Sequence, residues 1–155
     1  AAAIALDIDG IQEVIESHGF TGIDLANFNS PGQIVISGPE AEIKASLSPL
    51  KEAGAKLVVP LKVSGAFHSR MMAEPASEFS EFLEGFTFNS PAISVFANVT
   101  AAPYPDSSSI AETLVRQIYS PVRWTDTILG MRSAGADVFE ECGPGKVLTK
   151  LLRQI

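Results

Sequence analysis

The sequence GIDLANFNSPGQIVIS, residues 22–37, predicts two antiparallel strands joined by a tight turn. Residues 22–28 and 33–37 are rich in apolar side chains, and Asn29-Ser30-Pro31-Gly32 lies between them. Proline presets the φ angle that such a turn needs, and glycine accepts φ values that other residues avoid. We therefore expect a β-hairpin, and the elements predicted on both sides of it decide the fold.

The segments that flank this hairpin predict one strand and one helix on each side. Residues 1–6 are small and apolar, and Asp7 is a suitable N-cap for the helix that follows. After the hairpin, Gly38-Pro39-Glu40 opens a second helix that ends at Gly54, and residues 56–63 form a fourth strand. The order β-α-β-β-α-β over about 60 residues is that of a ferredoxin-like split βαβ unit.

Residues 63–155 follow this predicted small subdomain of residues 1–62 and alternate helices with short apolar segments. We expect helices at 71–83, 110–119, 124–132 and 146–155, and strands at 93–98 and 137–141. Such alternation predicts a parallel sheet with helices on its faces. Two strands cannot form this layered sheet alone, so we expect its other strands to come from sequence before Ala1. A chain that starts with alanine, already in a strand, is typical of a piece cut from a longer protein.

Composition limits the classes of function. The chain has 155 residues, of which 46% are hydrophobic and 19% charged, enough apolar character for a sizeable core. Its net charge is −7, and its lysines and arginines are scattered, so there is no basic stripe for nucleic acid. No apolar run is long enough to cross a membrane. The single cysteine, Cys142, excludes an internal disulfide and fits a reducing cytoplasm.

His68 is the first candidate for chemistry, because it lies in the segment VSGAFHSRMM, residues 63–72, where the two predicted parts meet. A histidine can act as a general base near neutral pH. It can equally cap the helix that follows, and spacing alone favours this second interpretation. Ser64 and Ser69 are poor candidates for its nucleophile, because the partners in known triads come from distant segments.

Other motifs carry weaker signals. The Gly-x-Ser-x-Gly elbow of serine hydrolases is absent. Cys142 could pair with His68 as a thiol nucleophile, but the interpretation as a small buried residue is favoured. Gly143-Pro144-Gly145-Lys146 could hold an anion at a helix start, but a tight strand-to-helix turn is favoured. His18 and His68 lack the spacing of metal ligands, so no metal site is expected.

Four segments of the chain together resemble one enzyme family. They are NFNSPGQIVISG (27–38), VSGAFHSRMM (63–72), VRQIYSPVRW (115–124) and EECGPGKVL (140–148). In this order, over nearly the whole chain, they are similar to the malonyl-CoA:acyl carrier protein transacylases and to the acyltransferase domains of polyketide synthases. The resemblance implies a ferredoxin-like subdomain on the C-terminal part of an α/β-hydrolase-like body.

The same resemblance implies a reaction in fatty acid or polyketide synthesis. A malonyl group would pass from malonyl-CoA to a serine and then to the phosphopantetheine thiol of an acyl carrier protein, with no permanently bound cofactor. His68 matches the catalytic base of the family, and Gln117 matches the residue whose backbone carbonyl orients that histidine. Phe67 matches the pattern of malonyl-selecting members, and Asn29 matches a residue on the side of the substrate pocket.

The chain departs from the family in one large respect. The serine elbow, the arginine that binds the malonyl carboxylate and the glutamine-rich loop of the oxyanion hole all precede the matched region in the family. We therefore expect a C-terminal half that supplies the base without the nucleophile, and that is inactive without the N-terminal half. An acyl hydrolase of the same family and a non-catalytic module that docks the carrier protein remain alternatives. Docking of an acidic carrier protein would need basic residues, for which Lys56, Lys62, Arg70 and Arg116 are candidates.

Overall fold

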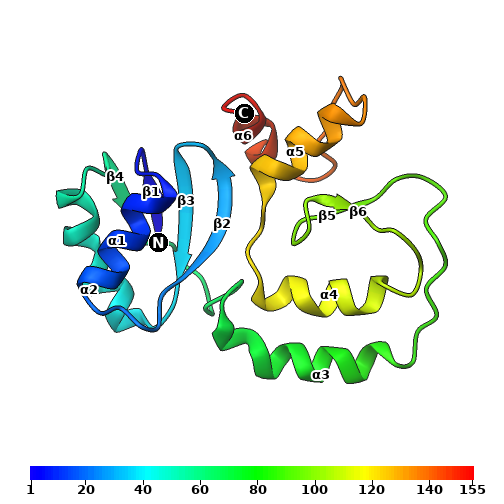
Figure 1. Cartoon of the computed structure of the whole chain (residues 1–155), viewed down its shortest axis with the longest axis horizontal. Helices are drawn as coiled ribbons and strands as arrows, with labels where there is room; N and C mark the ends of the chain where they lie inside the picture. The colour runs from blue at the N-terminus through cyan, green and yellow to red at the C-terminus, as the bar shows by residue number, and fades with distance from the viewer.

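The computed structural model describes residues 1–155 as a small sheet with two helices beside a larger, mainly helical part (Figure 1). The elements, with η1 a 3-10 helix, are β1 (Ala2–Ile4), α1 (Ile8–Ser17), β2 (Asp24–Ser30), β3 (Gln33–Ser37), α2 (Glu40–Glu52), β4 (Leu57–Val59), η1 (Arg70–Met72), α3 (Ala73–Leu83), β5 (Phe96–Ala97), β6 (Ala102–Pro103), α4 (Ile110–Tyr119), α5 (Trp124–Ser133) and α6 (Val147–Leu152).

The first part has the predicted β-α-β-β-α-β order and forms one four-stranded sheet. Its strand order is β2-β3-β1-β4, and every neighbouring pair is antiparallel. The predicted hairpin is confirmed, with Phe28 opposite Ile34 and Ser30 opposite Gln33. Only Pro31 and Gly32 remain as the turn, because β2 extends through Ser30.

The helices α1 and α2 contact each other and cover one side of this sheet (Figure 1). Their inward faces and the sheet share one hydrophobic core of ten buried residues. Ile11 of α1 and Leu50 of α2 are completely buried, and Ile36 of β3 is 1% exposed. Burial of such a side chain contributes about 1.5–3 kcal/mol, so this core stabilises the small part and fixes the orientation of β2.

Gly38, which follows β3, is a place where the backbone approaches too closely for a larger residue. A Cβ at Gly38 would lie 2.6 Å from the Gly22 carbonyl oxygen and 3.1 Å from the Ile23 Cα. We expect Gly38→Ala to lower the free energy of unfolding by about 1–3 kcal/mol, because two backbone segments would have to separate. Urea denaturation measures this change.

Gly32→Ala is the matched control, since a Cβ there would meet no atom within 4 Å. We expect its effect to stay within about 0.5 kcal/mol. Equal losses in the two variants would show that the close approach at Gly38 does not limit the packing of the hairpin.

The second part differs from the predicted parallel sheet. The strand expected at 93–98 is reduced to β5 and pairs in antiparallel fashion with β6, which lies in a segment where no strand was predicted. The strand expected at 137–141 is absent. Ile93 and Val138 are 78% and 82% exposed. The prediction was wrong here because a parallel strand needs neighbours for its backbone N–H and C=O groups, and this chain places none there.

The helices of the second part are close to those predicted. α4 has the expected bounds, and α3 packs against it in the contact with the most residue pairs between helices (Figure 1). The helix expected from residue 71 begins as η1, and α6 ends three residues before the C-terminus. None of the helices combines the length and the apolar character that a membrane span requires.

Strand β2 connects the two parts. The Phe28 backbone N–H donates to the Val122 carbonyl, and the Val122 N–H donates to the Ala26 carbonyl, both at 2.8 Å. Asn27 and Val122 thereby form a parallel bridge beside the sheet. The Thr125 hydroxyl adds a 3.2 Å hydrogen bond to the Phe28 carbonyl. The outer edge of β2 is thus satisfied by the segment between α4 and α5.

Candidate functional site

His68 lies in the loop between β4 and η1 and is held against the end of α4. Its backbone N–H donates to the Ile118 carbonyl at 3.2 Å, and its Nδ1 lies 3.0 Å from the Gln117 carbonyl oxygen. A carbonyl can only accept, so the contact assigns the proton to Nδ1 and leaves Nε2 with a free lone pair. The structure thus brings together His68 and Gln117, which the sequence had paired.

Both carbonyls belong to the last turn of α4, where the helix itself leaves its C=O groups without partners. His68 satisfies one of them with its backbone and the other with its ring. The C-terminal end of a helix carries partial negative charge, which favours a cation placed there. The Gln117 carbonyl is therefore a suitable acceptor for the ring in its neutral form and in its doubly protonated form.

The backbone of His68 adopts a left-handed conformation, with φ at +58°. Non-glycine residues adopt such angles rarely, although histidine, asparagine and aspartate do so more often than most. A residue held in this region costs about 1–3 kcal/mol and persists where its surroundings over-determine it. Here the two hydrogen bonds to α4 supply part of that constraint.

The side chain of Gln117 has a separate function from its backbone carbonyl. Its Oε1 accepts a hydrogen bond from the Asn98 backbone N–H at 3.0 Å. Partial burial raises the pKa of the Tyr104 phenol, and a hydrogen bond with the Gln117 side chain offsets part of this rise. Gln117 therefore ties the end of α4 to the segment around β5 and β6. Sequence reasoning did not find Asn98 or Tyr104, since nothing in their spacing points to Gln117.

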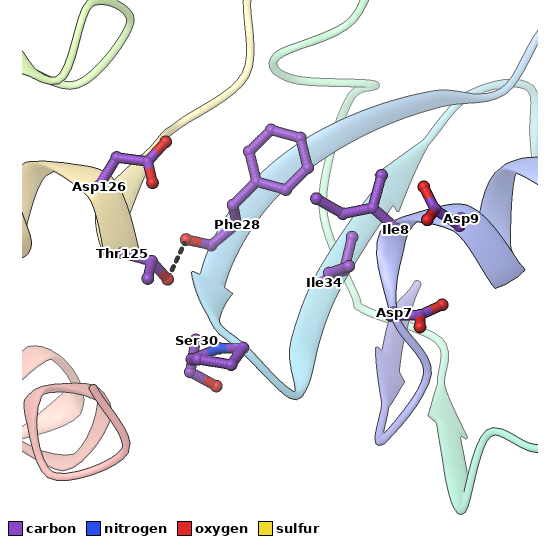
Figure 2. A pocket seen from close by; sticks show the side chains of 9 residues that line it. Asp7, Ile8, Asp9, Phe28, Ser30, Ile34, Thr125 and Asp126 are labelled. Carbon is purple, nitrogen blue, oxygen red and sulfur yellow. Dashed lines mark hydrogen bonds between the residues drawn. The ribbon is translucent and has the colours of Figure 1, made fainter.

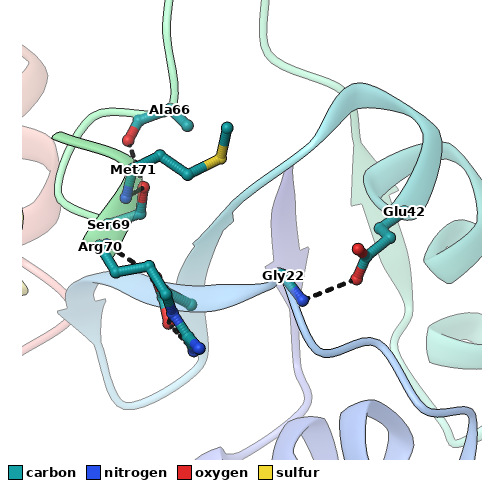
Figure 3. Close-up of polar contacts among 7 residues, drawn as sticks. Gly22, Glu42, Ala66, Ser69, Arg70 and Met71 are labelled. Carbon is teal, nitrogen blue, oxygen red and sulfur yellow. Dashed lines mark hydrogen bonds and ion pairs between the residues drawn. The ribbon is translucent and has the colours of Figure 1, made fainter.

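The two serines near His68 do not act as its partners. Ser69 is 1% exposed, and its hydroxyl donates to the Ala66 carbonyl at 2.6 Å and accepts from the Met71 N–H at 3.3 Å (Figure 3). It is the N-cap of η1, so its oxygen is already occupied. Ser64 is exposed and forms no hydrogen bond with His68. His68 thus has an orienting partner in Gln117, and neither adjacent serine is hydrogen-bonded to its ring.

An ion pair that the sequence analysis missed lies two residues from His68. Arg70 donates from its backbone N–H, at 2.9 Å, and from its guanidinium to the carboxylate of Asp24 on β2 (Figure 3). Partial burial raises the pKa of Asp24, but the hydrogen bonds from Arg70 outweigh this effect and hold the pKa below its usual value. Arg70 was a candidate for carrier protein docking, and its charge is instead paired within the chain.

Phe67 and Asn29, the two residues expected at the substrate pocket, occupy less defined positions. The side chain of Phe67 is 46% exposed, and its ring lies over Gly65. Asn29 is half-buried on β2, and no hydrogen bond joins it to His68. Phe67 is next to His68 in sequence, and its exposed ring is available for contact with a bound molecule.

The remaining candidates are not associated with His68. Cys142 is exposed, so the favoured interpretation as a buried residue is wrong. The glycine-rich turn at 143–146 is a tight turn, as expected, with Gly143 and Gly145 at positive φ. It has no room for an anion, because the Glu141 carboxylate already accepts from the N–H groups of Leu148 and Thr149 at the start of α6.

Hydrogen bonds from the backbone N–H and the hydroxyl of Thr149 lower the pKa of the Glu141 carboxyl group. His18, at the end of α1, stacks on Phe20 with ring centroids 5.7 Å apart. No group of three or more histidine, cysteine, aspartate or glutamate side chains is placed to hold a metal ion. These contacts give His18 and Glu141 local structural roles.

A cavity of about 400 Å³ lies between the hairpin and the starts of α1 and α5 (Figure 2). Its lining includes three carboxylates, two of which are already engaged: Asp7 caps α1, and Asp126 pairs with Arg123. Neither His68 nor Gln117 lines this cavity. The candidate site is therefore the partly buried His68 with Gln117, and not the cavity.

Comparisons with known proteins found one family model and several similar proteins. The family model described as acyl transferase domain matches residues 1–155. The chain is 43% identical, over 158 aligned positions, to the polyketide biosynthesis malonyl CoA-acyl carrier protein transacylase BaeC of Bacillus velezensis. The alignment covers 100% of this chain and 54% of BaeC. A crystal structure of an acyl carrier protein S-malonyltransferase from Vibrio cholerae is 38% identical with a TM-score of 0.93, over 99% of this chain and 50% of that one.

A second similar structure contains a partner. It is the malonyl-transacylase PlMCAT in complex with AntF, the acyl-carrier protein of a type II polyketide synthase, with 36% identity and a TM-score of 0.93 over 99% of this chain and 50% of that one. The chain thus spans about half the length of these relatives. The match over the whole chain and the mixed α/β fold lead to one conclusion: the chain belongs to the acyl transferase domain family.

Proposed function

We propose that this chain is the base-bearing half of an acyltransferase that moves a malonyl group from coenzyme A to an acyl carrier protein. The group would pass through an ester on a serine and end on the phosphopantetheine thiol. The observation that carries the proposal is the 3.0 Å contact between His68 Nδ1 and the Gln117 carbonyl. It leaves Nε2 free to take a proton, which is what a general base for a serine requires.

In this mechanism His68 transfers protons in both halves of the reaction. Nε2 takes the proton of the serine hydroxyl as the oxygen attacks the thioester carbonyl, and the proton then passes to the departing thiolate of coenzyme A. In the second half Nε2 takes the proton of the carrier thiol, and the serine oxygen leaves with that proton. The Gln117 carbonyl holds the ring in the same orientation throughout, so each proton moves at the same atom.

We propose that the nucleophilic serine and the arginine for the malonyl carboxylate lie in an N-terminal half that this sequence does not contain. The fact that the chain covers about half of its relatives supports this assignment. So do the large exposed apolar side chains of the second part, Ile93 and Val138 among them. We propose that segments 93–98 and 137–141 become strands of a parallel sheet when the other half supplies their neighbours.

We also propose that the chain consists of two parts with different folds. Residues 1–62 would be a ferredoxin-like subdomain, which the strand order β2-β3-β1-β4 and the two helices on one side support. Residues 63–155 would be the C-terminal part of an α/β-hydrolase-like body. Phe67 and Asn29 would line the acyl pocket between the two. The enzyme would hold no permanent cofactor and would work in the cytoplasm, in fatty acid or polyketide synthesis.

Intact-protein mass spectrometry with malonyl-CoA tests the proposed function. We expect the isolated chain of residues 1–155 to gain no malonyl adduct, because a base without a nucleophile does not form an ester. The full-length protein that contains it should gain one adduct, on a serine outside these residues. Addition of carrier protein with its phosphopantetheine arm should then transfer the group to the thiol.

Three results would contradict the proposal. A malonyl adduct on the isolated chain would show that the nucleophile lies within residues 1–155. Release of free malonate with no acylated carrier protein would indicate a hydrolase. Carrier binding with no adduct on any form of the protein would indicate a docking module. The same reaction with acetyl-CoA is the control for recognition of the malonyl carboxylate.

A further inference from the structure

We propose that the Asp24–Arg70 ion pair positions His68. It would fix residues 60–70, called here the His68 loop, relative to the small subdomain. This inference rests on the function proposed above, since it concerns how the base is held. No hydrogen bond joins Asp24 or Arg70 to the ring of His68 or to Gln117, so they act through the backbone between His68 and Arg70. They are positioning residues, separate from the group that moves the proton.

The geometry of the pair is more restrictive than that of an ordinary surface salt bridge. One carboxylate accepts from the backbone N–H of Arg70 at 2.9 Å and from Nε at 3.0 Å, and Nη2 forms a third contact. The Asp24 side chain is 20% exposed. A planar guanidinium that binds a carboxylate at two nitrogens fixes orientation as well as distance. The added backbone bond places the chain itself, two residues after His68.

The loop needs such an anchor because His68 is held at a φ of +58°. Its two bonds to α4 restrain it from one side, and the Ser69 hydroxyl restrains it from within. The hydrogen bonds from the loop to β2 all come from Arg70. Without them the backbone could relax from the left-handed region while the ring turned away from its present direction.

Strand β2 also holds the segment that follows α4, the helix whose end bonds to His68. Its edge bonds to Val122, three residues after the end of α4, while Asp24 at its start holds Arg70. The end of α4 and the His68 loop are therefore both fixed to the same strand. That arrangement sets the direction of Nε2 with respect to the small subdomain and to any substrate bound beside it.

Stability and rate should respond differently if this is correct. Arg70 is 66% exposed, and exposed ion pairs contribute little to the free energy of folding. A displaced base, in contrast, can reduce a rate by about 100-fold for a shift near 1 Å. A merely structural pair would change stability and rate together and modestly, whereas a positioning pair changes kcat far more than stability.

The test uses Asp24→Asn and Arg70→Lys in the full-length protein labelled with ¹⁵N-histidine. Asparagine keeps an acceptor for the Arg70 N–H but loses the charge, and lysine keeps the charge but loses the planar fork. We expect each variant to lower kcat by about 10- to 100-fold, with KM changed by less than about twofold. We also expect the His68 ring signals to lose the single Nδ1–H tautomer. Lys44→Gln, which removes the exposed Glu40–Lys44 pair, is the matched control and should change neither.

The ring signals separate this inference from the proposed function. If the parent protein transfers no acyl group, altered His68 signals in the two variants still support the positioning role. If the parent is active and both variants keep its kcat and its His68 signals, the proposal is wrong. A double variant should be no slower than the slower single variant, because both changes break the same contact; additive losses would also overturn the proposal.

Discussion

Replacing His68 by asparagine in the full-length protein is expected to slow malonyl transfer by about 10²- to 10⁴-fold, the usual contribution of a general base. Asparagine tolerates the left-handed backbone that His68 adopts at a φ of +58°. Its side-chain N–H₂ can still donate toward the Gln117 carbonyl, so the last turn of α4 keeps its cap. What it cannot do is accept the proton of a serine or a thiol.

The measurement is the rate at which carrier protein is malonylated, together with the urea midpoint of unfolding. We expect kcat to fall while the midpoint stays close to that of the parent. His18→Asn is the matched control, because His18 stacks on Phe20 at the end of α1 and forms no contact with His68. Transfer at the parent rate in the His68 variant would remove the base from the mechanism and leave His68 as a helix cap.

The small subdomain could be predicted from sequence because its signals are local. The Pro31–Gly32 turn, the apolar segment of β3 and the cap at Asp7 each act within a few residues, and the structure confirms them. Strands in the second part depend on neighbours far away in sequence. Segments 93–98 and 137–141 have the composition of buried strands, but composition alone cannot supply the partners that would bury them.

The candidate site shows the same division. His68 and Gln117 were paired through the family resemblance, and the structure places them 3.0 Å apart. Asp24 and Arg70 are 46 residues apart and leave no periodic pattern, so sequence reasoning treated Arg70 as a docking residue. The burial of Cys142 was mispredicted because it was inferred from the usual burial of free cysteine, and a residue type does not decide the burial of one particular position.

Lysine at Ile93 or Val138 is expected to change stability very little in the isolated chain and strongly in the full-length protein. Both side chains are more than three quarters exposed in this chain, at 78% and 82%. In the isolated chain the charge would stay in water and change the free energy of unfolding by less than about 0.5 kcal/mol.

In the full-length protein the same lysines should cost about 3–5 kcal/mol, the effect of an unpaired charge in a buried site. This follows because the proposed parallel sheet would place both segments between neighbouring strands and remove the two side chains from water. Urea denaturation of both forms measures the difference. Gln12→Lys, on the exposed side of α1, is the control and should have little effect in either form.

The difference in lost stability between the full-length protein and the isolated chain decides whether Ile93 and Val138 lie in an interface with the N-terminal half. A loss confined to the full-length protein supports strands that form only beside the N-terminal half. It would explain why segment 93–98 forms only the short β5 and segment 137–141 forms no strand in this chain. Small, equal effects in both forms would show that these segments remain on the surface in the whole enzyme. The base at His68 would then need no rearrangement of this part to meet its serine, and the two halves would join through another surface.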